Sequence, residues 1–142
     1  MPRHRRRPLR VLIVDDTPLY AETLELLLGA DARLEVVGAV ADGAQGVERA
    51  LGLRPDVVVM DVQMPVLDGI EATRQIRSSL RSTRVVVVTS SPTDERRAAA
   101  RAAGATAFLP KDAPIRDLLD AVAGPRSAEP ARGSPTLYAA FA

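Results

Sequence analysis

Residues that can bind metal or phosphate stand at the ends of short apolar runs in this sequence. Asp15 and Asp16 follow the run VLIV, and Asp61 ends the run VVVMD. Thr89 ends the run VVVVT, and Lys111 follows AFLP. Three carboxylates brought to one place repel one another unless a cation joins them. Oxygen ligands of this type suit Mg²⁺, which binds a few carboxylates and can share a phosphate. With a lysine and a threonine beside them, they predict a site for phosphoryl chemistry.

Lys111 is the only lysine of the chain, and every other residue among its 19 lysines and arginines is arginine. A compact ammonium on a flexible stem can enter a tight site that a planar guanidinium cannot. The position of this lysine, directly after a short apolar run, therefore favours a role in the site over chance.

The elements that must bring these residues together follow from the alternation of the sequence. Five runs rich in β-branched residues, RVLIVD, LEVVGAV, DVVVMD, RVVVVT and TAFL, are separated by helical patterns. Strands that alternate with helices favour an α/β fold whose parallel sheet is covered on both faces. We expect a doubly wound, flavodoxin-like sheet of five parallel strands in the order 2-1-3-4-5. In that order Asp61 lies between the acidic pair and Thr89, and Lys111 reaches in from the fifth strand.

The expected helices have recognisable ends. The first helix has four residues with the spacing of one face: Tyr20, Leu24, Leu27 and Leu28. Capping residues predict four helix starts: Thr17 before Pro18, Asp42 before Gln45, Asp68 before Glu71, and Ser91 before Pro92. Two glycines predict helix ends, Gly104 and Gly124.

The composition indicates one globular domain. The chain has 142 residues, of which 46% are hydrophobic, enough for a single core. It has no Cys, which excludes disulfides, thiolate metal sites and thiol catalysis. No apolar run approaches the ~18 residues of a membrane helix, and the basic first ten residues lack the apolar stretch of a secretory signal. We therefore expect a cytoplasmic protein without a membrane segment.

Three segments are expected along the chain: a basic flexible tail at residues 1–8, a folded domain at 9–124 and a Pro- and Ala-rich tail at 125–142. The second tail is too short for a DNA-binding module of at least ~50 residues. No output domain and no specific DNA binding are therefore expected of this chain alone. The arginines near the start could touch nucleic acid or an acidic surface, although a solvated tail is the commoner case. With 2 Phe, 2 Tyr and no Trp, the chain offers no aromatic platform for single-stranded nucleic acid.

The sequence resembles the receiver domains of two-component response regulators. The segments VLIVDD, VVVMDVQMPVLDG, VVVVTS and AFLPK occur in the order of that family and extend over roughly Leu9 to Gly124. They are most similar to receivers that usually precede a helix-turn-helix DNA-binding domain. The resemblance implies a phosphoacceptor that assists its own phosphorylation and dephosphorylation, not an enzyme with a separate substrate.

The resemblance implies a role for each site residue. Asp61 would accept the phosphoryl group from the phosphohistidine of a sensor histidine kinase. Asp16 would bind Mg²⁺ directly, Asp15 largely through water, and the backbone carbonyl of Gln63 would complete the protein ligands. Lys111 would pair with a phosphoryl oxygen.

Two further residues would form a switch. Thr89 would donate its hydroxyl to the phosphoryl group, and Phe108, at the position of the rotating aromatic residue of the family, would follow it inward. Phe108 has no hydroxyl, so it cannot form the hydrogen bond that a tyrosine would. The switched surface would face a downstream protein or a second receiver in a homodimer.

Two other functions are compatible with parts of the pattern. A phosphatase of the haloacid dehalogenase type also uses an Asp nucleophile, a Thr, a Lys and Mg²⁺. Its first motif separates the two Asp residues by one position, however, whereas Asp15 and Asp16 are adjacent, and it gives Asp61 no role. A degenerate receiver that binds partners without phosphate is the other alternative, and the complete acidic set argues against it.

Overall fold

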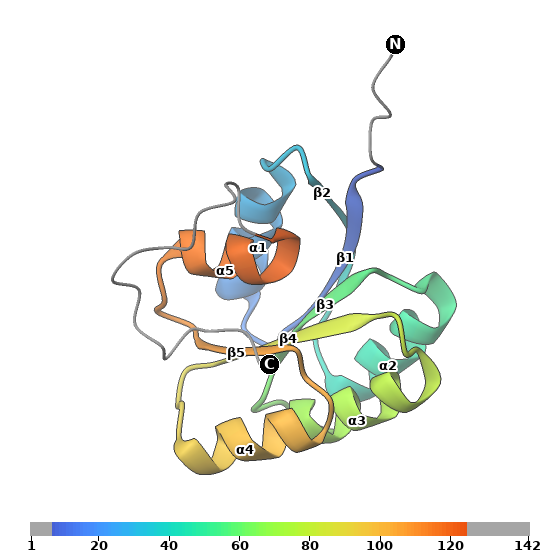
Figure 1. Ribbon diagram of the computed structural model, residues 1–142, viewed down its shortest axis with the longest axis vertical. Coiled ribbons are helices and arrows are strands. Elements are labelled where there is room, and N and C mark those ends of the chain that lie inside the picture. The colour runs from blue at the N-terminus through green and yellow to red at the C-terminus, as the bar shows by residue number, and fades with distance from the viewer. Residues whose placement is uncertain (1–6, 125–142) are drawn as a thin grey trace.

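The computed structural model describes residues 7–124 and contains five strands that alternate with five helices (Figure 1). The strands are β1 (Leu9–Val14), β2 (Leu34–Val40), β3 (Val57–Asp61), β4 (Arg84–Thr89) and β5 (Ala107–Pro110). The helices are α1 (Pro18–Gly29), α2 (Gly43–Leu53), α3 (Gly69–Ser79), α4 (Asp94–Ala102) and α5 (Ile115–Ala123). Residues 1–6 of the tail predicted at 1–8, and the whole tail predicted at 125–142, lie outside the described residues.

The five strands form one parallel sheet in the order β2-β1-β3-β4-β5, which confirms the predicted topology. The register places Val14 of β1 opposite Met60 of β3, and Thr89 of β4 opposite Pro110 of β5. Residues that follow β1, β3, β4 and β5 therefore meet at one edge of the sheet.

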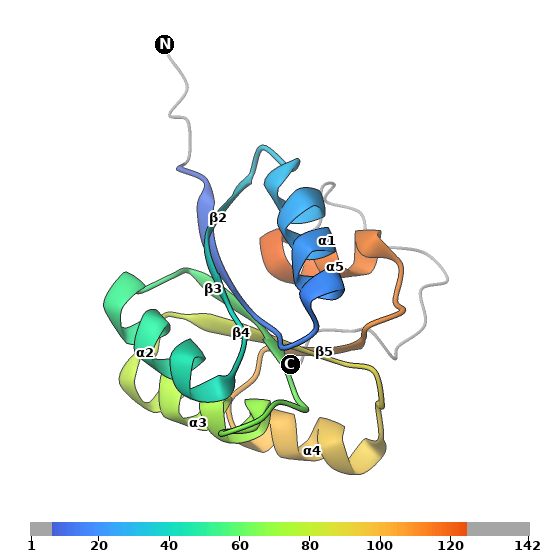
Figure 2. The same ribbon diagram turned by 180° about the vertical axis from the view of Figure 1, so that it is seen from behind.

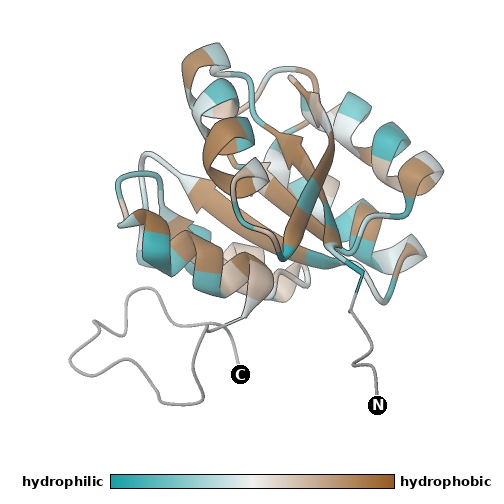
Figure 3. Cartoon of the chain, turned by 90° about the horizontal axis from the view of Figure 1, so that it is seen from above, coloured by the Kyte–Doolittle hydropathy of each residue, from teal (hydrophilic) through white to brown (hydrophobic). Residues whose placement is uncertain are grey.

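Helices cover both faces of the sheet, α1 and α5 on one side and α2, α3 and α4 on the other (Figures 1 and 2). The central strands are almost entirely apolar and buried, because a strand covered on both faces cannot alternate with polar residues. Figure 3 shows this hydrophobic sheet between the two helical layers. The core is correspondingly split in two, one cluster on each face of the sheet.

Most predicted helix ends are present. The side chains of Asp42 and Asp68 accept hydrogen bonds from the backbone N–H groups of Gln45 and Glu71, as their spacing predicts. The predicted start at Ser91 is wrong. The cap of α4 is Thr93, whose hydroxyl accepts from the backbone N–H of residue 96, and it stands directly before two acidic residues that favour the positive end of the helix dipole.

The start of α1 and the ends of α4 and α5 lie at the predicted residues. Thr17 occupies the cap position of α1, but its side chain makes no capping hydrogen bond. Gly104 follows α4 and Gly124 ends α5, both with positive φ, as predicted. Within residues 7–124, no helix has the length and apolar character needed to cross a membrane.

Candidate functional site

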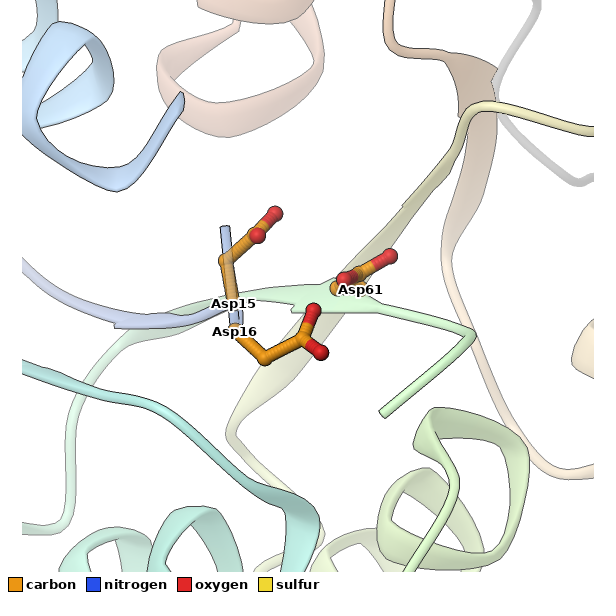
Figure 4. A group of neighbouring side chains, drawn as sticks. All are labelled: Asp15, Asp16 and Asp61. Carbon is orange, nitrogen blue, oxygen red and sulfur yellow. The ribbon is translucent and has the colours of Figure 1, made fainter. Parts of the chain in front are cut away.

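Three carboxylates converge where β1 and β3 end. Asp15 and Asp16 follow β1, and Asp61 is the last residue of β3. Each offers an oxygen, and the three oxygens lie within 4.8 Å of one another. Figure 4 shows the three side chains gathered at the strand ends. The convergence follows from parallel pairing, because the register that places Val14 beside Met60 also brings the next residues together.

The carboxylates differ in their exposure to solvent. Asp15 and Asp61 are buried, whereas Asp16 is exposed. Burial, with a contribution from the negative charge of Asp15, raises the pKa of Asp61 to about 6. A hydrogen bond with Asp16 raises this pKa further, while the positive charge of Lys111 lowers it. Without a further cation, Asp61 therefore keeps its proton to a higher pH than an ordinary carboxyl group does.

Asp15 connects the site to the start of α1. One of its oxygens, Oδ1, accepts a hydrogen bond of 2.8 Å from the backbone N–H of Thr17. The other, Oδ2, lies 2.8 Å from Nζ of Lys111. Since Thr17 directly precedes α1, this carboxylate fixes both the first turn of the helix and the position of the ammonium group.

Lys111 is the cation of the site. Its Nζ lies 2.8 Å from Asp15 and 3.4 Å from Oδ2 of Asp61, and 15% of its side chain is exposed. Its backbone N–H donates to the carbonyl oxygen of Thr89, which extends the β4–β5 pairing by one residue and aims the side chain at the strand ends.

Tyr20 is the residue at this site that sequence reasoning missed. Nζ of Lys111 lies over the Tyr20 ring, 4.6 Å from its centroid, within the range of a cation–π interaction. Burial, together with the charges of Asp15 and Asp61, raises the pKa of Tyr20 to about 12. The available signal was its place one helical turn after Asp16, but an aromatic residue on an apolar helix face reads first as core.

The two predicted switch residues lie outside the acidic cluster. Thr89 is fully buried, and its hydroxyl accepts a hydrogen bond of 3.1 Å from the backbone N–H of Ser91. Phe108 is buried in the core cluster under α4, together with Ala100. Among the described residues, no side-chain hydrogen bond joins Thr89 to Asp61.

The loop between β3 and α3 closes the other side of the site. Gln63 is exposed in this loop, two residues after Asp61. Gly69, at the start of α3, donates its N–H to the carbonyl of Val62, and a Cβ atom there would overlap the backbone carbonyl oxygen of Asp61. Gly69 therefore allows the helix to approach the strand end closely.

The donor set fits a hard divalent cation. All three side chains offer carboxylate oxygens, the ligand type that Mg²⁺ prefers, and their crowding makes them hard to ionise together. No thiolate is available in the chain, which has no Cys. The same pocket supplies an ammonium group 3.4 Å from Asp61. Such an arrangement can hold a phosphoryl group between positive charges.

Comparison with known proteins identifies the family. Residues 11–123 match the model of the response regulator receiver domain. The transcriptional regulatory protein LiaR of Bacillus subtilis is 37% identical over 122 residues, which cover 86% of this chain and 58% of LiaR. A protein-glutamate methylesterase/protein-glutamine glutaminase of Geobacter sulfurreducens is 40% identical over 123 residues, which cover 85% of this chain and 33% of that protein. The chain thus spans between a third and somewhat over half of the length of these relatives.

Solved structures agree with the sequence relatives. The signal receiver domain of NarL from Mycobacterium tuberculosis superposes with a TM-score of 0.77 at 31% identity, covering 84% of this chain and 99% of that one. A CheX–CheY–BeF3–Mg²⁺ complex from Borrelia burgdorferi contains a chain with a TM-score of 0.76 at 25% identity, with 81% and 87% coverage. These matches do not support the phosphatase alternative. The chain belongs to the response regulator receiver domain family of two-component systems.

Proposed function

We propose that Asp61 accepts a phosphoryl group from the phosphohistidine of a sensor histidine kinase. The convergence of three carboxylates with the Lys111 ammonium, 3.4 Å from Asp61, is the observation that carries this proposal. Asp61 ends the central strand, beside the two acids that follow β1, and the Lys111 ammonium contacts both Asp61 and Asp15.

The reaction is a transfer between two nucleophiles. A carboxylate oxygen of Asp61 attacks the phosphorus, and a P–O bond forms as the P–N bond of the phosphohistidine breaks. The electron pair of that bond leaves on the imidazole nitrogen. The raised pKa of Asp61 means that its ionised form, the nucleophile, is the form that the cations of the site must stabilise.

The neighbouring residues bind and orient the group. Asp15, Asp16 and Asp61, with the backbone carbonyl of Gln63, would hold Mg²⁺, which supplies positive charge beside the phosphoryl oxygens. The Lys111 ammonium, 3.4 Å from Asp61, would pair with a phosphoryl oxygen. The family match and the CheY complex with BeF3 and Mg²⁺ support this assignment.

Two residues would pass the signal on. Once Asp61 is phosphorylated, Thr89 exchanges its bond with the Ser91 N–H for one to a phosphoryl oxygen, and Phe108 shifts with it. The surface formed by β4, α4 and β5 then changes for a downstream protein or a second receiver. In this role the chain is a phosphoacceptor and not an enzyme with a separate substrate.

The test is intact-protein mass spectrometry after incubation with acetyl phosphate and Mg²⁺. The wild type should gain the mass of one phosphoryl group, and Asp61→Asn should gain none. Asp112→Asn is the matched control, because this exposed carboxylate directly follows Lys111 and lies outside the cluster. Labelling of Asp61→Asn at the wild-type level would refute the assignment.

A further inference from the structure

The Lys111 ammonium has three neighbours in the site, and one of them is not charged. Asp15 and Asp61 place oxygens at 2.8 and 3.4 Å, and the ring of Tyr20 lies beneath Nζ at 4.6 Å. Only 15% of the Lys111 side chain is exposed, so contacts with the protein restrict where its ammonium can lie, and these three groups are the contacts found there.

The two charged neighbours are also the oxygens that a metal ion would use. The cluster of three acids includes both Asp15 and Asp61. When these oxygens are committed to a divalent cation, they attract the ammonium less, and the two cations repel each other. The Tyr20 ring attracts a cation but is no ligand for Mg²⁺, which prefers oxygen donors. The ammonium and a metal ion therefore compete for the oxygens of Asp15 and Asp61 but not for the Tyr20 ring.

The fold holds the ring in this place. Tyr20 lies in the first turn of α1, and Leu24, one turn later, is buried in the core. Asp15 fixes the start of the same helix through the backbone N–H of Thr17. Beside the ring is a cavity of about 140 Å³ between α1, β5 and α5, lined by Tyr20, Leu27 and Lys111 among others. The lysine thus has room to adjust while its ammonium stays over the ring.

We propose that Tyr20 is a positioning residue whose ring holds the Lys111 ammonium next to Asp61 while Asp15 and Asp61 are engaged by metal. This inference rests on the proposed phosphoacceptor role of Asp61. It predicts that the aromatic face matters and the hydroxyl does not. It also predicts that binding of a phosphoryl group depends on Tyr20 more than binding of metal does.

Nuclear magnetic resonance tests the contact directly, because Lys111 is the only lysine. Protein labelled with ¹³C-lysine gives a single set of lysine side-chain signals, and the Hε protons should show an upfield ring-current shift. This shift should persist when Mg²⁺ saturates the site. Tyr20→Leu should abolish it, and Tyr20→Phe, which keeps the ring, should retain it.

Binding measurements test the consequence. Tyr20→Leu should weaken beryllofluoride binding in saturating Mg²⁺ and slow labelling by acetyl phosphate, each by about fivefold. Its Mg²⁺ affinity should be equal to or tighter than that of the wild type, because a weakly held ammonium competes less for the acids. Tyr20→Phe should have the wild-type beryllofluoride affinity and the wild-type rate of labelling by acetyl phosphate. Leu27→Ala enlarges the same cavity without removing the ring and should behave as the wild type.

Each other outcome has a defined meaning. Wild-type beryllofluoride affinity in Tyr20→Leu, or an unchanged lysine signal, would refute the positioning role. A Tyr20→Phe variant as impaired as Tyr20→Leu would assign the effect to the hydroxyl and also refute it. Failure of the wild type to bind beryllofluoride, with the ring-current shift intact, would instead refute the proposed function of Asp61.

Discussion

At the scale of single residues, Asp61 is under two opposing electrostatic influences. Burial and the neighbouring acids favour its protonated form, while Lys111 favours its ionised form. A phosphoacceptor carboxylate needs to be ionised to attack, but it also needs neighbours that stabilise additional negative charge after transfer. Lys111 serves both needs, whereas burial and the neighbouring acids oppose the first, so Asp61 is ionised at a cost in stability that a bound cation can offset.

The raised pKa predicts a pH dependence in the metal-free protein. Because the pKa of Asp61 is about 6 in the folded state and 3.8 in the reference state, the folded state binds more protons between these values. The protonated Asp61 carboxyl therefore contributes its full stabilisation of the folded state below pH 3.8, and this stabilisation is lost as the pH rises through 6. In EDTA, Asp61→Asn should therefore exceed the wild type in unfolding free energy at pH 7.5 by on the order of 2–3 kcal/mol.

Urea unfolding at pH 4.5 and 7.5 measures this difference. The advantage of Asp61→Asn should shrink at the lower pH, where the wild-type carboxyl is protonated. Asp112→Asn should show no such change between the two pH values. An advantage that is equal at both would contradict a raised pKa at Asp61.

Removal of the Asp16 carboxylate should raise the stability of the metal-free protein and abolish its stabilisation by Mg²⁺. It is the exposed member of the cluster, so its removal relieves repulsion without opening a cavity. Asp16→Ala in EDTA should gain up to about 1 kcal/mol in unfolding free energy. The wild type should gain about 2.7 kcal/mol at Mg²⁺ 100 times above Kd, and the variant should lose this response.

Thermal unfolding with and without Mg²⁺ provides the measurement. Glu25→Ala, which removes an exposed acid on α1 outside the cluster, should keep the wild-type Mg²⁺ response. A wild-type melting temperature that does not change with millimolar Mg²⁺ would argue against the site.

At the scale of elements, arginines secure three segments of the fold to helix ends. The guanidinium of Arg10 donates to the carbonyls of Leu53, the last residue of α2, and of Arg54, which follows it. Arg84 donates to the carbonyls of residues 121 and 122 in the last turn of α5, and Arg33 donates to that of residue 124. One planar guanidinium can satisfy two carbonyls at once, which an ammonium does less well. These contacts explain several of the arginines and make the single lysine more informative.

Sequence reasoning could predict what depends on neighbouring residues. The strand runs, the caps at Asp42 and Asp68, and the strand ends that bring the three acids together follow from local pattern and from parallel pairing. The arginine contacts to helix ends could not be predicted, because they join residues 37 to 91 positions apart. The ring of Tyr20 beneath Lys111 was missed for the same reason, since a pattern does not show which face of a helix meets a distant side chain.

Because α3 approaches β3 closely, a single methyl group added at Gly69 should destabilise the fold strongly. A Cβ atom at Gly69 would overlap the carbonyl oxygen of Asp61, and backbone cannot easily move there. Gly69→Ala should lower the unfolding free energy by about 2–4 kcal/mol, as overpacking and backbone shifts typically do. Gly52→Ala is the matched control in the last turn of α2, where nothing lies within 4 Å of the added atom.

Chemical denaturation of both variants checks this expectation. Gly52→Ala should raise the unfolding free energy by about 0.5–1 kcal/mol through helix propensity. Equal stability of the Gly69→Ala and Gly52→Ala variants would mean that α3 does not press against the strand end.

The loop between β3 and α3 contains a strained residue. Val66 has a φ of 72°, which is unfavourable for a β-branched side chain, and 81% of the residue is exposed, so packing does not hold it there. Val66→Asn should raise the unfolding free energy by about 1 kcal/mol, because Asn tolerates this conformation. Val66→Ala, which keeps a Cβ atom, should gain less. A loss of stability in Val66→Asn by urea unfolding would show that the valine side chain makes a favourable contact.

At the scale of the whole molecule, the helices differ in how firmly the core holds them. Helix α4 buries one residue, Ala100, whereas α1 buries Leu24 and Leu28 and α3 buries four residues. An element with few buried contacts opens at low free energy and is the one that a switch can move. Phe108 lies in the same core cluster as Ala100, and Thr89 stands at the end of the strand before α4. The two proposed switch residues are therefore connected, through the core cluster and the chain, to the helix with the fewest buried residues.

This arrangement predicts where beryllofluoride changes amide exchange. In Mg²⁺, binding at Asp61 should draw Thr89 toward the site and alter protection in β4, α4 and β5, while the buried turns of α1 around Leu24 stay unchanged. Hydrogen exchange read by mass spectrometry, with and without beryllofluoride, is the measurement, and Asp61→Asn is the control that should show no difference. Thr89→Ala should retain the change near the acids but lose the one in α4, because its hydroxyl is the proposed connection. If protection in the wild type changes only around the acids, the domain carries phosphate without switching a surface, and the roles assigned to Thr89 and Phe108 are wrong.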